Sequence, residues 1–171
     1  MWNADAPDSG VSVSGSRLLM PLQTKLERIP SREENRMIPR MFGHGLAEVD
    51  VTWGTLQPIE LAPGVRTIGE LELIEHLGRG LAAIDTRLEE FRREATIPGS
   101  RGITHEEILD HLDELDPSSP TAFFCNGPQC TATPQAIERL LDAGYPAAAI
   151  LYYRGGMHDW ITLGLPTVSG K

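Results

Sequence analysis

The residues of this chain best suited to chemistry lie in one short stretch, FFCNGPQCTATPQ, which holds its only two cysteines, Cys125 and Cys130. An apolar run ends at Cys125, a loop with glycine and proline carries Cys130, and Thr133-Pro134 is typical of a helix start. A loop that runs from a strand into a helix directs backbone N–H groups, and the positive end of the helix dipole, at its first residue. We expect this to lower the pKa of Cys125 from ~8.5 by about one unit or several, and to make it a nucleophile.

The simplest alternative is that Cys125 is a small buried apolar side chain, which is a common role for a free cysteine. The second thiol, the threonine-proline helix start and Gly127, which permits a sharp backbone curl, together favour a reactive site. Pro128 has no N–H and removes one donor from the loop.

The spacing of the loop excludes several other chemistries. A phosphatase or arsenate-reductase loop needs an arginine six residues after its cysteine, but the chain has Thr131 and Ala136 at these positions. Thioredoxin-type sites have two residues between their cysteines, whereas four lie between these two. The chain also lacks the GxxxxGK[ST] pattern of a P-loop. Phosphoryl chemistry is therefore not expected.

A zinc site is not expected either. The stretch HEEILDH is similar to the HExxH pattern, but Leu109 stands where the second histidine should be. His105 and His111 are six residues apart and do not share a helix face.

The composition restricts the class of protein that carries this loop. The chain has 171 residues, 40% of them hydrophobic, which suits one domain with an extension. Its formal net charge is -9. Such a charge argues against nucleic acid or an anionic membrane as partner. No apolar run approaches the ~20 residues that span a bilayer, and the start lacks a secretory signal. We expect a cytoplasmic protein whose cysteines stay as thiols.

The hydrophobic pattern alternates between short apolar strands and amphipathic helices. Strands are expected over 81–85, 121–125 and 147–153, and helices over 67–80, 104–115, 133–145 and 155–164. Continuous apolar strands alternating with helices indicate an α/β fold, with a parallel sheet covered on both faces. Asp85, Cys125 and Arg154 each lie at or just beyond the end of a strand, which is the edge where such sheets bind ligands.

Two of these helices have recognisable start signals. Thr104 and Glu107 form a capping-box pattern ahead of the acidic segment, and Thr133 is expected to cap the helix that follows the cysteine loop.

The N-terminal part of the chain is less regular. About the first fifteen residues are expected to be disordered because they are rich in Ser, Gly, Asp and Pro. Val49, Val51 and Trp53 alternate with polar residues, which predicts a strand, or a hairpin that continues to Leu61.

The segment from about Thr67 to Pro166 resembles the rhodanese (sulfurtransferase) family in four motifs. These are LAAIDTRLEEF, with Asp85 and Arg87 matching the family's Asp-x-Arg; TIPGSRGI, with Thr96 in place of the family's His; FFCNGPQC; and YYRGGMHDWITLGLP. The motifs occur in the family's order and spacing across about 100 residues. The loop is similar to a Cys-Asn-Gly-Pro-x-Cys variant of the family.

The resemblance implies a five-stranded parallel sheet flanked by helices on both faces, forming a domain over residues 66–171 after an extension over residues 1–65. It implies that sulfur moves from a donor such as thiosulfate, through a persulfide on Cys125, to a thiophilic acceptor, either a small thiol or a protein. No metal or organic cofactor is implied. The site would have Cys125 as its nucleophile. The loop whose amides hold the persulfide would consist of Asn126, Gly127, Pro128, Gln129, Cys130 and Thr131. Asp85, Arg87 and Arg154 would support this loop.

The chain departs from the family in two respects. Many members carry a cation in the loop that would hold the donor anion, but this loop has none, so Arg154 or Arg101 is expected to replace it. Cys130 is also unusual, and it could accept the persulfide, form a disulfide with Cys125 or only pack.

Two alternatives to sulfur transfer therefore stay open at this point. The protein could be a thiol-redox protein that uses the Cys125–Cys130 pair. It could also be a catalytically inactive binding module whose extension, around Trp53, makes the contacts that matter. The sequence does not indicate the oligomeric state.

Overall fold

The computed structural model describes residues 55–170 in full and the backbone of two short strands, β1 (Arg40–Phe42) and β2 (Leu46–Glu48). These two strands pair antiparallel as a small hairpin. The expectation of a strand at Val49, Val51 and Trp53, and that of a disordered start, lie outside the described residues. Residues 55–61, where this strand or hairpin was expected to continue, contain no regular strand.

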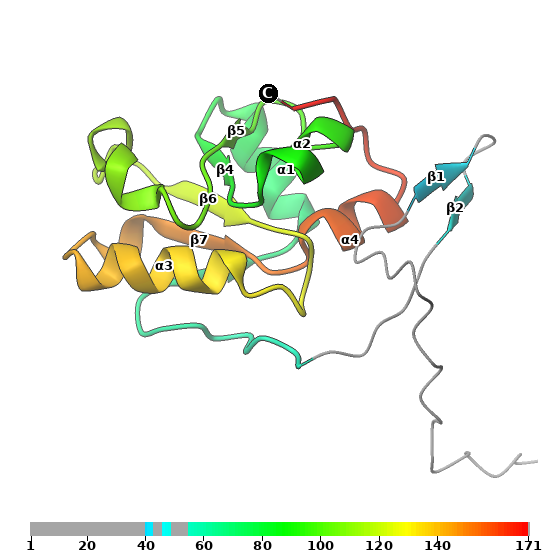
Figure 1. The fold of residues 1–171 in the computed structure, drawn as a ribbon. Helices are drawn as coiled ribbons and strands as arrows, with labels where there is room; N and C mark the ends of the chain where they lie inside the picture. Colours follow the sequence, from blue (N-terminus) through cyan, green and yellow to red (C-terminus); the bar gives the residue numbers. More distant parts are fainter. Residues whose placement is uncertain (1–39, 43–45, 49–54, 171) are drawn as a thin grey trace, which may run out of the picture.

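The main body is a five-stranded parallel sheet in the order β3-β7-β6-β4-β5 (Figure 1). Its strands are β3 (Arg66–Ile68), β4 (Ala83–Asp85), β5 (Arg101–Gly102), β6 (Thr121–Phe124) and β7 (Ile150–Tyr153). The elements between them are the helices α1 (Glu70–Gly78), α2 (Glu89–Glu94) and α3 (Ala132–Asp142) and the 3-10 segments η1 (Ile108–Glu114) and η2 (Ala147–Ala149), and α4 (Gly156–Thr162) follows β7. The predicted α/β class and five-stranded parallel sheet are confirmed.

Alternation along the strands divides the core into two halves. Phe123 and Tyr152 face α3 and η1, where they pack with Ile137 and Leu140. Their neighbours face the other side of the sheet and pack on α1 and α4; this second cluster includes Leu73, Phe124, Leu151, Tyr153, Met157 and Trp160. Both faces of the sheet are therefore covered, as its continuous apolar strands require.

The structure differs from the expected helix over 67–80, because residues 66–68 form a strand and the helix begins at Glu70. The sequence did not predict β3, a three-residue edge strand that begins with the exposed Arg66. In α1 the buried positions are Leu73 and His76, whereas Leu71 is 82% exposed. Leu71 is exposed because α1 packs on the sheet through one narrow face, which contains Leu73 and His76.

The acidic segment expected as a helix over 104–115 forms the 3-10 segment η1 instead. Thr104 and Glu107 are in contact as predicted, because the Glu107 N–H donates to Thr104 Oγ1 at 3.3 Å and the threonine hydroxyl donates to the glutamate carboxylate at 2.6 Å. His111, inside the segment, has non-helical backbone angles, which interrupts a regular α-helix there.

Candidate active site

Cys125 directly follows β6, the central strand of the sheet, and is 2% exposed. The loop 126–131 turns away from the strand end and leads into α3. Cys130 lies near the end of this loop, is partly exposed and, like Cys125, is a free thiol. The structure thus brings both cysteines to the carboxyl edge of the sheet and the N-terminus of α3.

The N-terminus of α4 holds the loop by its backbone. The Met157 N–H donates to Cys125 O at 2.9 Å, and the His158 N–H donates to Asn126 O at 2.8 Å. Gly156 makes this approach possible because it has a φ of 57° and because a Cβ there would collide with the carbonyl oxygen of Cys125. Gly156 of the YYRGGMHDW motif therefore allows the first turn of α4 to hold the loop.

The loop itself is closed by one turn. The Cys130 N–H donates to Gly127 O at 3.0 Å. A Cβ on Gly127 would lie 2.9 Å from the Cβ of His158, so the loop also needs glycine here to pack on α4. Pro128 and Gln129, at the tip of this turn, are both partly buried.

The two thiols lie close together, and their ionisation is unequal. The S–H of Cys125 donates to the backbone carbonyl of Cys130 at 3.8 Å. Interaction with the Cys125 side chain lowers the pKa of Cys130 to about 6. The N–H groups of Ala132 and Asn126 and the charge of His105 lower this pKa further. Burial raises the pKa of Cys125 well above its usual range, and the neighbouring Cys130 raises it more.

The expected lowering of the Cys125 pKa is therefore not found, and Cys130 has the lower pKa of the pair. The physical reason is burial, because Cys125 is enclosed at the strand end whereas Cys130 sits where the loop meets solvent. The helix N-terminus does act on both sulfurs: Ala132 N–H reaches Cys130, and the N–H and hydroxyl of Thr133 reach Cys125.

Thr133 does not cap α3 as predicted. The helix begins at Ala132 with Thr131 as the cap residue, which leaves Thr133 fully buried inside the first turn. Its hydroxyl hydrogen-bonds to that of Thr86 at 2.8 Å, and Thr86 in turn donates to Phe124 O at 3.0 Å. Thr133 thus connects the first turn of α3 to Thr86 and the end of β6 beneath the site, a role that the sequence alone did not indicate.

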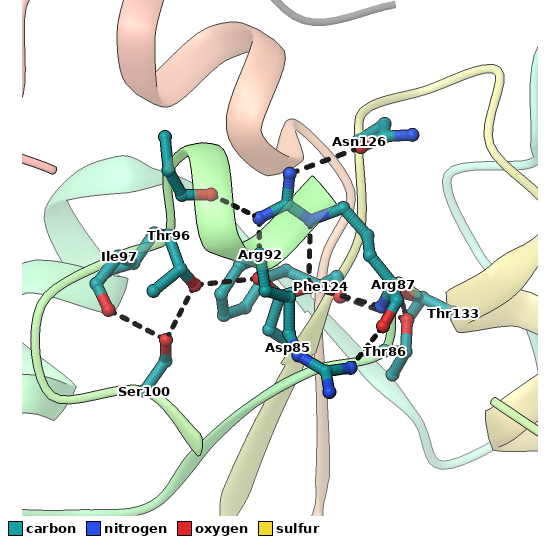
Figure 2. A network of polar contacts seen from close by, with 11 residues as sticks. Asp85, Thr86, Arg87, Arg92, Thr96, Ile97, Ser100, Phe124, Asn126 and Thr133 are labelled. Atoms are coloured by element: carbon teal, nitrogen blue, oxygen red, sulfur yellow. Dashed lines mark hydrogen bonds and ion pairs between the residues drawn. The ribbon is translucent and has the colours of Figure 1, made fainter. Parts of the chain in front are cut away.

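Asp85 and Arg87 form a buried two-point ion pair under the loop (Figure 2). Arg87 Nε donates to Asp85 Oδ1 at 2.9 Å and Nη2 donates to Oδ2 at 2.6 Å. Arg87 Nη1 reaches Asn126 Oδ1 at 3.4 Å, which ties the pair to the residue after Cys125. Thr96, in place of the family's histidine, donates to Asp85 Oδ2 at 2.7 Å. The pair braces the loop and does not contact the thiols by any of these bonds.

The two candidate cations differ in position. The guanidinium of Arg101 forms an ion pair with Glu114 on η1. Arg154 follows β7 at the same edge as the loop, and its Nε donates to Gln57 O at 2.9 Å. Its charge lowers the pKa of Tyr152, so it acts on the region of the thiols. This geometry favours Arg154 over Arg101.

Gln57 belongs to a segment that the sequence did not connect with the site. Its N–H donates to Pro128 O at 2.7 Å, and its carbonyl accepts from Arg154, so it joins the loop to the end of β7. Gln57 makes both hydrogen bonds through its backbone, so no residue pattern in the sequence predicts them.

Two further findings concern metals and membranes. Among the described residues, no group of three or more His, Cys, Asp or Glu side chains could hold a metal ion. No helix in the described part of the chain is long and apolar enough to cross a membrane.

The rhodanese-like domain family model matches residues 70–163, more than half of the chain. The chain therefore belongs to the rhodanese-like domain family, and its fold and motifs agree with this. No curated protein sequence matches it.

Solved structures with the same fold include the BH2092 protein from Bacillus halodurans, with a TM-score of 0.55, 19% identity, and coverage of 61% of this chain and 77% of that one. A full-length protein from Lactobacillus plantarum gives a TM-score of 0.52 at 18% identity, covering 60% of this chain and 87% of that one. A thiosulfate sulfurtransferase from Pseudomonas aeruginosa gives 0.54 at 24% identity, where 66% of this chain matches only 22% of that much longer chain.

Proposed function

We propose that the protein is a sulfurtransferase in which Cys125 carries sulfane sulfur as a persulfide and Cys130 is the base that activates it. The observation that carries the proposal is the pair of cysteines at the N-terminus of α3, where the S–H of the buried Cys125 donates to the backbone carbonyl of the partly exposed Cys130. Cys130 has the lower pKa of the two. A nucleophile beside a group that can take its proton is the arrangement that covalent catalysis needs.

In the first step Cys130 takes the proton of Cys125 while the sulfur of Cys125 attacks the outer sulfur of thiosulfate. The S–S bond of thiosulfate breaks, sulfite leaves with the electron pair, and the products are the Cys125 persulfide anion and the Cys130 thiol. In the second step a nucleophile such as cyanide or a thiolate attacks the outer sulfur of the persulfide. The bond to Cys125 Sγ breaks and its thiolate recovers the proton from Cys130.

The same residues account for holding the donor and the sulfur anion. Arg154 offers the cation that the loop lacks, at the edge where the donor must enter. The N–H of Thr133, in the first turn of α3, already reaches the sulfur of Cys125 and favours negative charge there. The donor is then a small sulfur anion such as thiosulfate, and the acceptor is a small thiol or a protein cysteine. The protein would act in the reducing cytoplasm. The route uses no metal or organic cofactor.

The test is a thiosulfate:cyanide assay that measures thiocyanate with purified wild type, Cys125→Ser and Cys130→Ser. We expect Cys125→Ser to lose at least about a thousandfold in activity, because the only group that can carry the sulfur is gone. Cys130→Ser, the matched control at the other thiol, should keep a measurable part. Full turnover by Cys125→Ser would contradict the proposal.

A thiol-redox function is the second candidate, and the contact between the Cys125 sulfur and the Cys130 backbone favours it because it keeps the two cysteines close together. Here the Cys130 thiol gives its proton to the outer sulfur of the Cys125 persulfide anion, and the resulting Cys130 thiolate attacks the inner sulfur. The S–S bond of the persulfide breaks, the outer sulfur leaves as hydrosulfide, and a Cys125–Cys130 disulfide forms. The persulfide is reduced and the thiol pair oxidised, so no other oxidant is needed. This function predicts hydrosulfide release without an added acceptor.

A further inference from the structure

Tyr152 is a buried residue that the proposed chemistry has not yet used. It lies in the middle of β7, is 0% exposed, and its ring belongs to the apolar cluster between the sheet and α3. A phenylalanine would fill this apolar space equally well. The hydroxyl is therefore the part of the side chain that needs a reason.

The hydroxyl of Tyr152 is buried and has no hydrogen-bond partner among the described residues. The next residue on the strand, Tyr153, shows the usual arrangement, since its hydroxyl donates to Glu70 Oε1 at 3.1 Å. A buried O–H without a partner is destabilising, so such a group often marks a place where a ligand or reacting atom completes the bond.

The strand register places Tyr152 on the face of the sheet where Cys125 lies. Tyr152 pairs with Phe123 across the parallel β6–β7 ladder, and Cys125 lies two residues beyond Phe123, hence on the same face of the sheet. Burial raises the pKa of Tyr152, a negative charge on Cys125 or Cys130 raises it further, and Arg154 lowers it. The phenol thus keeps its proton at neutral pH and lies within the electric field of both sulfurs.

We propose that the Tyr152 hydroxyl is a further catalytic residue, which donates a hydrogen bond to the sulfur anion that forms at Cys125. In the free protein the hydroxyl is bonded to neither sulfur. When Cys125 becomes a thiolate or persulfide, the new negative charge attracts the phenol, and the anion acquires a donor in addition to the N–H of Thr133. No proton is transferred. The inference rests on the proposed function, because it names a group that stabilises that same anion.

The experiment compares Tyr152→Phe with Tyr145→Phe in the full chain. Tyr145 is the matched control, because its hydroxyl is also buried. Its pKa responds to burial, Thr121 and Asp116 rather than to the thiols. Two quantities are measured for each variant. One is the rate of Cys125 persulfide formation with thiosulfate, and the other is the thiolate pKa of Cys125, read by ultraviolet absorbance in a Cys130→Ser background.

We expect Tyr152→Phe to slow persulfide formation about tenfold to a hundredfold and to raise the Cys125 pKa by about one unit or more, because a hydrogen bond to a charged acceptor is lost. Tyr145→Phe should change neither. The melting temperature of Tyr152→Phe without ligand should not fall, since no folded-state bond is removed.

The two readouts separate the failure of this inference from that of the proposed function. If the wild type transfers sulfur and Tyr152→Phe changes neither rate nor pKa, the inference is overturned. If the wild type forms no persulfide but Tyr152→Phe still raises the Cys125 pKa, the proposed function fails while the bond from phenol to thiolate is supported. A clear loss of thermal stability in Tyr152→Phe alone would assign the hydroxyl a structural partner and overturn the inference.

Discussion

At the scale of single residues, the two cysteines divide the work that one cysteine was expected to do. Burial raises the pKa of Cys125, while the neighbouring Cys125 side chain and the loop and helix amides lower the pKa of Cys130. Under the proposed function, Cys125 is the buried nucleophile and the partly exposed Cys130 is its base. This division follows from the position of each sulfur, since the two residues are chemically the same.

The pH dependence of sulfur transfer tests this division. Because Cys130 must lose its proton to act as base, kcat/KM for thiosulfate should rise with pH through a pKa of about 6 and level off above it. In Cys130→Ser the rise should move to alkaline pH, towards the raised pKa of Cys125 itself. Initial rates across a pH series check this, and an unmoved profile in the serine variant would show that Cys130 is not the base.

The sequence could predict which residues gather at the site, but not their ionisation. Cys125 and Cys130 were identified from residue types and spacing, and Asp85 and Arg87 from the family's pattern. The lower pKa was assigned to the wrong sulfur because burial depends on how deeply β6 ends within the sheet. Tyr152 was missed because its direction depends on the register between β6 and β7, which no local pattern reveals.

At the scale of elements, three parts of the fold hold the cysteine loop in position: the end of β6, the first turn of α3 and the first turn of α4. The predicted strands over 81–85, 121–125 and 147–153 are present because continuous apolar runs bounded by turns are a strong signal. β3 was missed because three residues at the edge of a sheet give too little pattern. The cap residue of α3 is Thr131, two residues before the predicted cap Thr133, which lies buried in the first turn.

The first turn of α4 offers a test of how the loop is held. Gly156→Ala should destabilise the protein by more than about 2 kcal/mol, because the methyl group meets the Cys125 carbonyl in addition to the cost of a positive φ. Gly164→Ala is the matched control, with a φ of 72° and no neighbour within 4 Å of an added Cβ, so only the φ cost of about 1–2 kcal/mol applies.

Urea denaturation measures both variants, and sulfur transfer by Gly156→Ala should fall along with its stability. Equal losses of unfolding free energy in the two variants would show that α4 does not hold the loop closely.

At the scale of the whole molecule, the site combines segments that are far apart in the chain. Gln57, Pro128 and Arg154 meet at one edge of the sheet through two hydrogen bonds. Gln57 precedes the segment that matches the family model. It also precedes residue 66, where we predicted the domain to begin, and this predicted boundary stays a prediction. Leu61 and Ala62, also before it, pack against the core cluster on the α3 side. Residues 57–62 therefore act structurally with the domain.

Gln57→Pro tests the contact because proline has no N–H to donate to Pro128. Loss of one hydrogen bond of about 1 kcal/mol should let the loop open about fivefold more often and speed the alkylation of Cys130 by iodoacetamide to a similar extent. Gln57→Ala keeps the N–H and should alkylate at the wild-type rate. The contact would be irrelevant to loop opening if both variants alkylated at the wild-type rate.

The central claim, a persulfide on Cys125, is tested most directly by intact-mass analysis of reduced protein after incubation with thiosulfate. The wild type and Cys130→Ser should each gain one sulfur atom, and Cys125→Ser should gain none. A loss of two hydrogens that requires both cysteines would instead support the thiol-redox function. An unchanged mass in the wild type would contradict sulfur transfer and leave a rhodanese-like fold that serves as a binding module.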